Sequence, residues 1–181
     1  ATHSVYLCNE ETLRRASELA EKRNGRLHIH VSETRKEIAD LHARTGMYPV
    51  EYLDDIEFFQ PGTICAHASW VKKNEIRTLK KHEAIAVHCP SSNMKLACGG
   101  TLSLPAYIEA GVDVRIGTDG AASSGSGLNM QAEARLASLL QRHDHWDATL
   151  LTAAETMKMA TKGSKDWAVW DLNDVRMRPR G

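Results

Sequence analysis

The 181 residues carry 23 basic and 23 acidic side chains, so the formal net charge is zero. This balance gives no electrostatic reason to expect nucleic acid or a membrane surface as a partner. With 42% apolar and 25% charged residues, and no apolar run of membrane-spanning length, the composition is that of a globular chain with one core.

The cysteine content indicates the redox compartment. The four cysteines, Cys8, Cys65, Cys89 and Cys98, form no CxxC pair and no dense framework. They are predicted to be reduced, mostly buried thiols of a cytoplasmic protein.

A helix is the first element predicted in the chain, over residues 9–25. Asn9 is a suitable N-cap, because its side-chain oxygen can accept a backbone N–H of the first turn. A strand follows over residues 26–32. In this strand His28 and His30 alternate with aliphatic residues, so both imidazoles lie on one face.

Strand-then-helix units occupy the rest of the chain. The helix after the first strand is predicted to begin with a capping box, Thr34 to Glu37, and to end at Gly46. Further strands are predicted over 63–69, 84–90 and 112–120, and the helices after them over 74–83, 102–111 and 128–143. This alternation predicts an α/β fold with a parallel sheet.

Each predicted strand ends in a side chain that can bind a metal or transfer a proton. These four residues are His30, His67, His88 and Asp119. The carboxyl ends of parallel strands meet at one edge of a sheet, where active sites form. One such residue would be unremarkable, but four in succession predict a functional site.

Two carboxylates leave alternatives open when each is considered alone. Glu33 follows His30 by one turn and either moves protons for a metal site or is an exposed first-turn acid. Asp119 lies in a glycine-rich turn and either reaches a metal or forms an Asx-turn. His88 precedes Cys89, but neighbouring strand residues point to opposite faces, so a Cys/His nucleophile pair is not expected.

Four segments together resemble a known superfamily. "HIHVSET", "CAHASW", "HCPSSNMKLACGG" and "IGTDGAASSGSGLNM" resemble, in order and spacing, motifs of the amidohydrolase superfamily. The similarity is greatest to the branch of cyclic-amidine aminohydrolases, which includes methylthioadenosine/S-adenosylhomocysteine deaminases, guanine deaminases and s-triazine chlorohydrolases. It extends from about residue 3 to residue 162. The resemblance implies a (β/α)8 TIM barrel with one divalent metal ion, zinc or iron.

The resemblance also implies residue roles. His30, ending strand five of the barrel, corresponds to a metal ligand, and Glu33 to the carboxylate that protonates the substrate's ring nitrogen. His67, ending strand six, corresponds to the histidine that orients the nucleophilic water. Asp119, ending strand eight, corresponds to a metal ligand that also takes a proton from this water. His3 corresponds to a substrate contact.

The same resemblance implies roles for two further histidines, His88 and His28. His88 belongs to the strand-seven motif and is a candidate substrate contact. "HIH" corresponds to strand five and not to the strand-one His-x-His of the superfamily. His28 is therefore expected to pack inside the barrel and not to bind metal.

The chain is too short for a whole barrel of this type, which needs roughly 250 residues. We expect residues 1–162 to form the C-terminal portion of the barrel, strands five to eight, and residues 163–181 to be a divergent tail. Such a partial (β/α)8 barrel exposes two sheet edges. It is therefore expected to form a homo-oligomer or to be completed by a missing N-terminal segment.

The function expected for the complete enzyme is metal-dependent hydrolytic deamination of a small aminated heterocycle, adenosine-, methylthioadenosine- or guanine-like. The isolated chain is expected to be weakly active or inactive, because His30 and Asp119 alone make an open zinc site. A triazine-type hydrolase and a non-catalytic, self-associating fragment are the alternatives. A flavodoxin-like sheet is disfavoured, because no glycine-rich phosphate turn follows the first strand.

Overall fold

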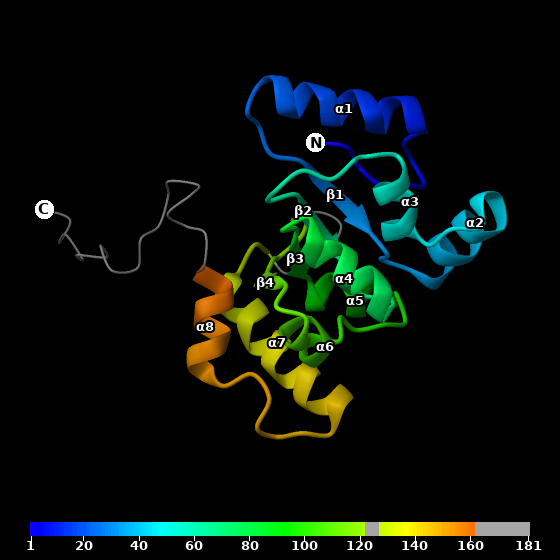
Figure 1. Cartoon of the computed structure of the whole chain (residues 1–181). Coiled ribbons are helices and arrows are strands. Elements are labelled where there is room, and N and C mark those ends of the chain that lie inside the picture. Colours follow the sequence, from blue (N-terminus) through cyan, green and yellow to red (C-terminus); the bar gives the residue numbers. More distant parts are fainter. Residues whose placement is uncertain (122–126, 162–181) are drawn as a thin grey trace, which may run out of the picture.

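A four-stranded parallel sheet forms the centre of the computed structural model, which describes residues 1–121 and 127–161. The strands lie in the order of the chain: β1 (His28–Val31), β2 (Ile64–His67), β3 (Ile85–His88) and β4 (Asp113–Ile116). The helices of the described residues are α1 (Glu10–Lys22), α2 (Arg35–Thr45), α3 (Pro49–Asp55), α4 (Lys73–Lys81), α5 (Pro90–Lys95), α6 (Leu104–Glu109), α7 (Met130–His145) and α8 (Ala153–Thr161). Figure 1 shows α1 at one end of the sheet and α7 and α8 at the other.

The predicted parallel sheet of strand-and-helix units is confirmed. The short helices α3 and α5 were not predicted; each begins at a proline, whose fixed φ suits the first turn of a helix. Helix α8 was also not predicted, and α7 continues to His145, beyond the predicted end at residue 143. The tail predicted over 163–181 lies outside the described residues and stays a prediction.

Alternation along the strands gives the sheet two different faces. On β1 the side chains of Ile29 and Val31 are fully buried, whereas His28 and His30 are half-buried. The face with the aliphatic residues packs into the hydrophobic core. The other face corresponds to the inside of a barrel and carries the polar residues that the rest of the argument concerns.

This inner face is continuous across the four strands. The register pairs His28 with Ile64 and, further along the sheet, Ile85 with Asp113. Asp113 and Arg115 form an ion pair of 3.0 Å on β4. This face of the sheet is therefore partly polar along β1 and β4 as well as at the C-terminal ends of the strands.

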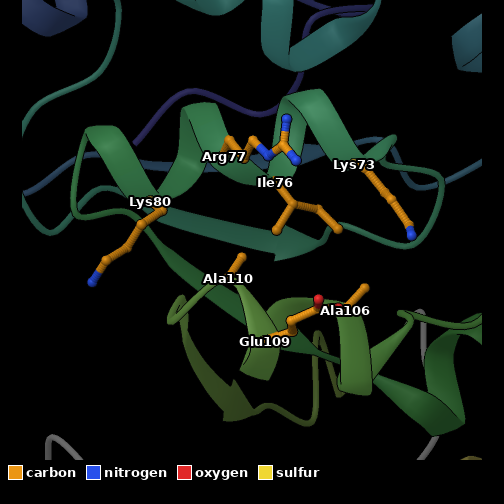
Figure 2. Close-up of a pocket in the computed structure, with 7 residues that line it drawn as sticks. All are labelled: Lys73, Ile76, Arg77, Lys80, Ala106, Glu109 and Ala110. Carbon is orange, nitrogen blue, oxygen red and sulfur yellow. The ribbon is translucent and has the colours of Figure 1, made fainter.

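The outer layer contains a groove between α4 and α6 (Figure 2). Its volume is about 290 Å³, and it is lined by Lys73, Ile76, Arg77, Lys80, Ala106, Glu109 and Ala110. None of the predicted site residues lines it. Within residues 1–121 and 127–161, no helix is both long enough and apolar enough to cross a membrane.

Candidate active site

His30, near the end of β1, has one ring nitrogen fixed by the backbone. The carbonyl oxygen of His3 accepts both the backbone N–H of His30, at 2.8 Å, and its Nδ1–H, at 2.9 Å. The Nε2 atom is then the unprotonated nitrogen of the neutral ring and lies 3.9 Å from Oδ1 of Asp119. The N-terminal segment therefore orients His30 toward the C-terminal end of the sheet.

His67, the last residue of β2, is oriented in the same way. It adopts the left-handed conformation, with φ of 68°, and its side chain is 1% exposed. Its Nδ1–H donates to Oδ1 of Asn93 at 2.8 Å. Its Nε2 lies 3.8 Å from Oε2 of Glu33 and 3.9 Å from Oδ2 of Asp119. Burial lowers the pKa of His67, although Glu33 and Asn93 favour the charged ring.

Asp119 was predicted to end the fourth strand, but it lies three residues beyond β4, with φ of 58°. Oδ2 accepts the hydroxyl of Ser92 at 2.6 Å, and Oδ1 accepts the backbone N–H of Gly120 at 2.7 Å. Burial opposes ionisation, but these two hydrogen bonds and the imidazoles of His67 and His30 outweigh it and lower the pKa of Asp119. Asp119 is therefore a carboxylate anion at neutral pH.

Glu33 lies just beyond β1 and is 8% exposed, so the view of it as a solvent-exposed first-turn acid is wrong. The hydroxyl of Tyr6 donates to Oε2 at 3.2 Å, and the thiol of Cys98 lies 3.7 Å from Oε1. Burial, followed by the charge of Glu33, raises the pKa of Tyr6 to about 12. Burial, and to a smaller extent the charge of Glu33, also raises the pKa of Cys98 to about 11, so both partners are neutral donors near neutral pH.

The four side chains form one cluster, with His30 and His67 near the ends of β1 and β2, and Glu33 and Asp119 in the loops after β1 and β4. Ligand atoms of His30, His67 and Asp119 all lie within 4.8 Å of one another, and Oε2 of Glu33 lies 3.8 Å from the same Nε2 atom of His67 that faces Asp119. Two imidazole nitrogens and a carboxylate at this spacing are a donor set that suits zinc or iron.

A model of the amidohydrolase family matches residues 1–165 of the chain. The chain belongs to the amidohydrolase family. Amidohydrolases are metal-dependent, and the TIM-barrel fold of their solved members agrees with the four parallel strands described above. The chain is accordingly part of a (β/α)8 barrel.

Curated relatives and solved structures extend this amidohydrolase assignment. A 5'-deoxyadenosine deaminase of Methanosphaera stadtmanae is 43% identical over 162 residues, which are 90% of this chain and 38% of that relative. A 5-methylthioadenosine/S-adenosylhomocysteine deaminase of Pyrococcus furiosus is 41% identical over 89% of this chain and 38% of its own length. A zinc-bound adenosine deaminase structure from Xanthomonas campestris is 35% identical with a TM-score of 0.82, covering 87% of this chain and 36% of that one. The chain therefore spans less than two fifths of the length of each of these three proteins.

The cluster is chemically suited to the metal ion of an amidohydrolase. The carbonyl oxygen of His3 accepts the Nδ1–H of His30, and Oδ1 of Asn93 accepts that of His67. Both rings therefore present an unprotonated Nε2 toward Asp119. Such outer partners fix the tautomer of metal-binding histidines. His30 and Asp119 would hold the ion, with His67 beside them.

The remaining predicted site residues lie at different distances from this cluster. The ring of His3 lies 4.7 Å from that of His30 and is exposed, so it is available at the mouth of the site. His28 shares the inner face with His30, with ring centroids 5.4 Å apart. His88 is 1% exposed and its Nε2 lies 3.4 Å from Gln141 on α7, so the structure does not bring it to the open side of the cluster.

Sequence reasoning did not assign the partners that orient the cluster. Asn93 and Ser92 lie on α5, in a segment whose many hydrogen-bonding groups were the only signal in the sequence. Tyr6 and Cys98 had no signal at all, because they approach Glu33 across 27 and 65 positions of the sequence. The catalytic, substrate-binding and metal roles of the predicted residues stay predictions.

Proposed function

We propose that this chain supplies the strand-five-to-eight part of a metal-dependent deaminase that acts on an aminated purine, as a nucleoside or a base, and releases ammonia. The observation that carries the proposal is that the Nε2 atom of His67 lies within 4 Å of both Glu33 and Asp119. Hydrolytic deamination needs one group that removes a proton from water and another that delivers a proton to the ring, and the two carboxylates are suited to these tasks. The names of the similar proteins, deaminases of adenosine derivatives and of guanine, support the same substrate class.

In the proposed reaction, water adds to the amino-bearing carbon of the heterocycle. Asp119, an anion held by Ser92 and Gly120, accepts the proton that this water loses, and His67 orients the water. Glu33 delivers a proton to the adjacent ring nitrogen. The proton held by Asp119 then passes to the amino group, the carbon–nitrogen bond of the tetrahedral intermediate breaks, and ammonia leaves. The hydroxyl proton of the intermediate returns to Glu33, and a carbonyl group forms at the reacting carbon.

A divalent ion is the cofactor of the proposal, and zinc is our choice because a similar structure holds zinc. When bound, such an ion would lower the pKa of its water ligand to near neutrality and would polarise the reacting carbon centre. His30 and Asp119 would hold it. Catalytic zinc sites take three or more protein ligands, so we propose that a further segment or a second copy of the chain completes the site and the barrel.

The decisive experiment compares two forms of the protein. One is the 181-residue chain with added zinc; the other is a chimera in which residues 1–162 replace the matching segment of the Methanosphaera stadtmanae relative. Ammonia release is followed with 5'-deoxyadenosine, methylthioadenosine and guanine. We expect deamination by the chimera and little by the chain alone. A folded, zinc-loaded chimera that releases no ammonia from any of them would support the non-catalytic alternative.

The substitution Glu33→Gln tests the proton donor within the active form. We expect turnover to fall by about 10²- to 10⁴-fold, because glutamine cannot deliver a proton. Zinc content, measured by mass spectrometry, stays unchanged because Glu33 is not a proposed ligand. Turnover close to that of the parent would remove Glu33 from this role.

A further inference from the structure

Glu37, on the first turn of α2, holds the backbone of the loop that carries Glu33. Its side chain is buried, with 3% of the residue exposed. Oε1 accepts the backbone N–H of Ser32 and Oε2 that of Glu33, both at 2.8 Å. The predicted capping box is half confirmed: Thr34 Oγ1 accepts the backbone N–H of Glu37 at 3.1 Å, but the carboxylate reaches beyond Thr34 to the two preceding residues.

The loop that Glu37 grips is held from a second side. Ser32 adopts the left-handed conformation, with φ of 52°, which a residue with a Cβ rarely adopts. Its carbonyl oxygen accepts the backbone N–H groups of Ser69 and Trp70, at 3.1 Å and 2.9 Å. The backbone that enters Glu33 is thus fixed between α2 and the loop after β2.

We propose that Glu37 is a positioning residue that holds Glu33 at the reacting ring nitrogen; this inference rests on the function proposed above. Oε2 of Glu33 lies 3.8 Å from Nε2 of His67, so a small backbone shift would take it away from the reacting atoms. A misplacement of about 1 Å can slow catalysis about 10²-fold. Glutamine in place of Glu37 would accept only one of the two N–H groups and would present its own N–H₂ to the other.

Glu75 provides a matched control for Glu37. It also lies on the first turn of a helix, α4, and is fully buried. Its Oε1 accepts the backbone N–H of Val50 and its Oε2 that of Lys72, both at 3.0 Å. Neither Val50 nor Lys72 belongs to the site. Glu75→Gln therefore removes the same kind of buried, doubly bonded carboxylate without removing a hydrogen bond to Ser32 or Glu33.

Steady-state kinetics of the active form separates positioning from stability. We expect Glu37→Gln to lower kcat by about 10- to 100-fold with KM within about threefold of the parent, because it displaces a proton donor and not a binding group. Glu75→Gln should leave both constants within about threefold. Equal losses of kcat in the two variants would overturn the proposal.

A second readout needs no activity and uses Cys98 of the 181-residue chain. Burial, followed by the charge of Glu33, raises the pKa of this thiol to about 11. In a Cys8→Ser background, Glu37→Gln should speed the modification of Cys98 by a disulfide reagent, because a displaced Glu33 leaves more thiolate. Glu75→Gln corrects for general loosening, and equal rates in the two variants overturn the positioning role. If the rates differ but the parent chimera deaminates nothing, the positioning stands and the proposed function fails.

Discussion

At the scale of single residues, the cluster depends on hydrogen bonds that leave one nitrogen of each histidine free. His67 shows this most clearly, since Asn93 Oδ1 accepts its Nδ1–H and Asn93 Nδ2 donates to Ser69 Oγ at 2.6 Å. Asn93 is 4% exposed. With both ends of the amide fixed, Asn93 sets the tautomer of His67 as well as its orientation.

The substitution Asn93→Ala is therefore expected to weaken the binding of zinc. Without the acceptor, the proton of the neutral His67 ring can move to Nε2, which then faces Glu33 and Asp119 as a donor. We expect zinc affinity, measured by competition with a chelating dye, to weaken about 10- to 100-fold. The exposed Asn74, which donates to Glu51 at 2.6 Å, provides the control Asn74→Ala. If Asn93→Ala binds zinc as tightly as the parent, the tautomer of His67 does not affect zinc binding.

At the scale of elements, α7 covers the sheet through buried polar contacts as well as apolar ones. Gln141 of α7 donates from Nε2 to the carbonyl oxygen of Leu102 at 2.8 Å and lies 3.4 Å from His88 on β3. Burial, followed by the charge of His67, lowers the pKa of His88 to about 4. The packing of α7 on β3 therefore requires a neutral imidazole.

This requirement predicts a pH dependence of stability. The pKa of His88 is about 4 in the folded chain and about 6.5 when unfolded. The stabilisation is present above pH 6.5 and is lost as pH falls toward 4, because the unfolded chain takes up the proton first. The loss amounts to about 3 kcal/mol.

The measurement is urea unfolding at several pH values between 4 and 7. Burial raises the pKa of Glu37 to about 7, which gives a slope of opposite sign over part of the same range, so the parent curve alone does not isolate His88. The difference between the parent and His88→Leu does isolate it, and the acid-side slope should be reduced in the variant. The exposed His143 supplies the control His143→Leu, whose slope should match the parent. A His88→Leu slope equal to that of the parent would contradict the prediction.

At the scale of the whole molecule, the described sheet has two unpaired edges, β1 and β4, and a half-open inner face. Ser4 pairs with His30 through an isolated parallel bridge, which covers only part of the β1 edge. Unpaired edges are templates for further strands. The inner face therefore favours association with a second copy or with further strands.

We predict that the 181-residue chain associates with itself through this face. Sedimentation of the 181-residue chain should show an assembly that grows with concentration. Ile64→Lys, on the half-buried inner face, should shift the chain toward monomer, because a lysine there opposes burial of the face. Ile108→Lys, at a position that is 59% exposed on the outer helix α6, should not. A parent chain that stays monomeric at all concentrations would contradict the prediction.

The sequence by itself determined the order of the strands and helices, the parallel sheet and the polar residues at the strand ends. These follow from local periodicity, as the alternation of His28 and His30 with buried Ile29 and Val31 shows. It did not predict the helices that begin at Pro49 and Pro90, because a proline is as compatible with a turn as with a first helical turn.

Only the tertiary structure decided which polar side chains meet. His88 ends its strand in the same kind of pattern as His67, yet one is enclosed beside α7 and the other faces two carboxylates. The orientation of His67 by Asn93, the hydrogen bond from Ser92 to Asp119 and the contact of Tyr6 with Glu33 all join segments that lie 26 or 27 residues apart. Local periodicity carries no information about such contacts, because a side chain's partners depend on how distant segments of the chain pack together.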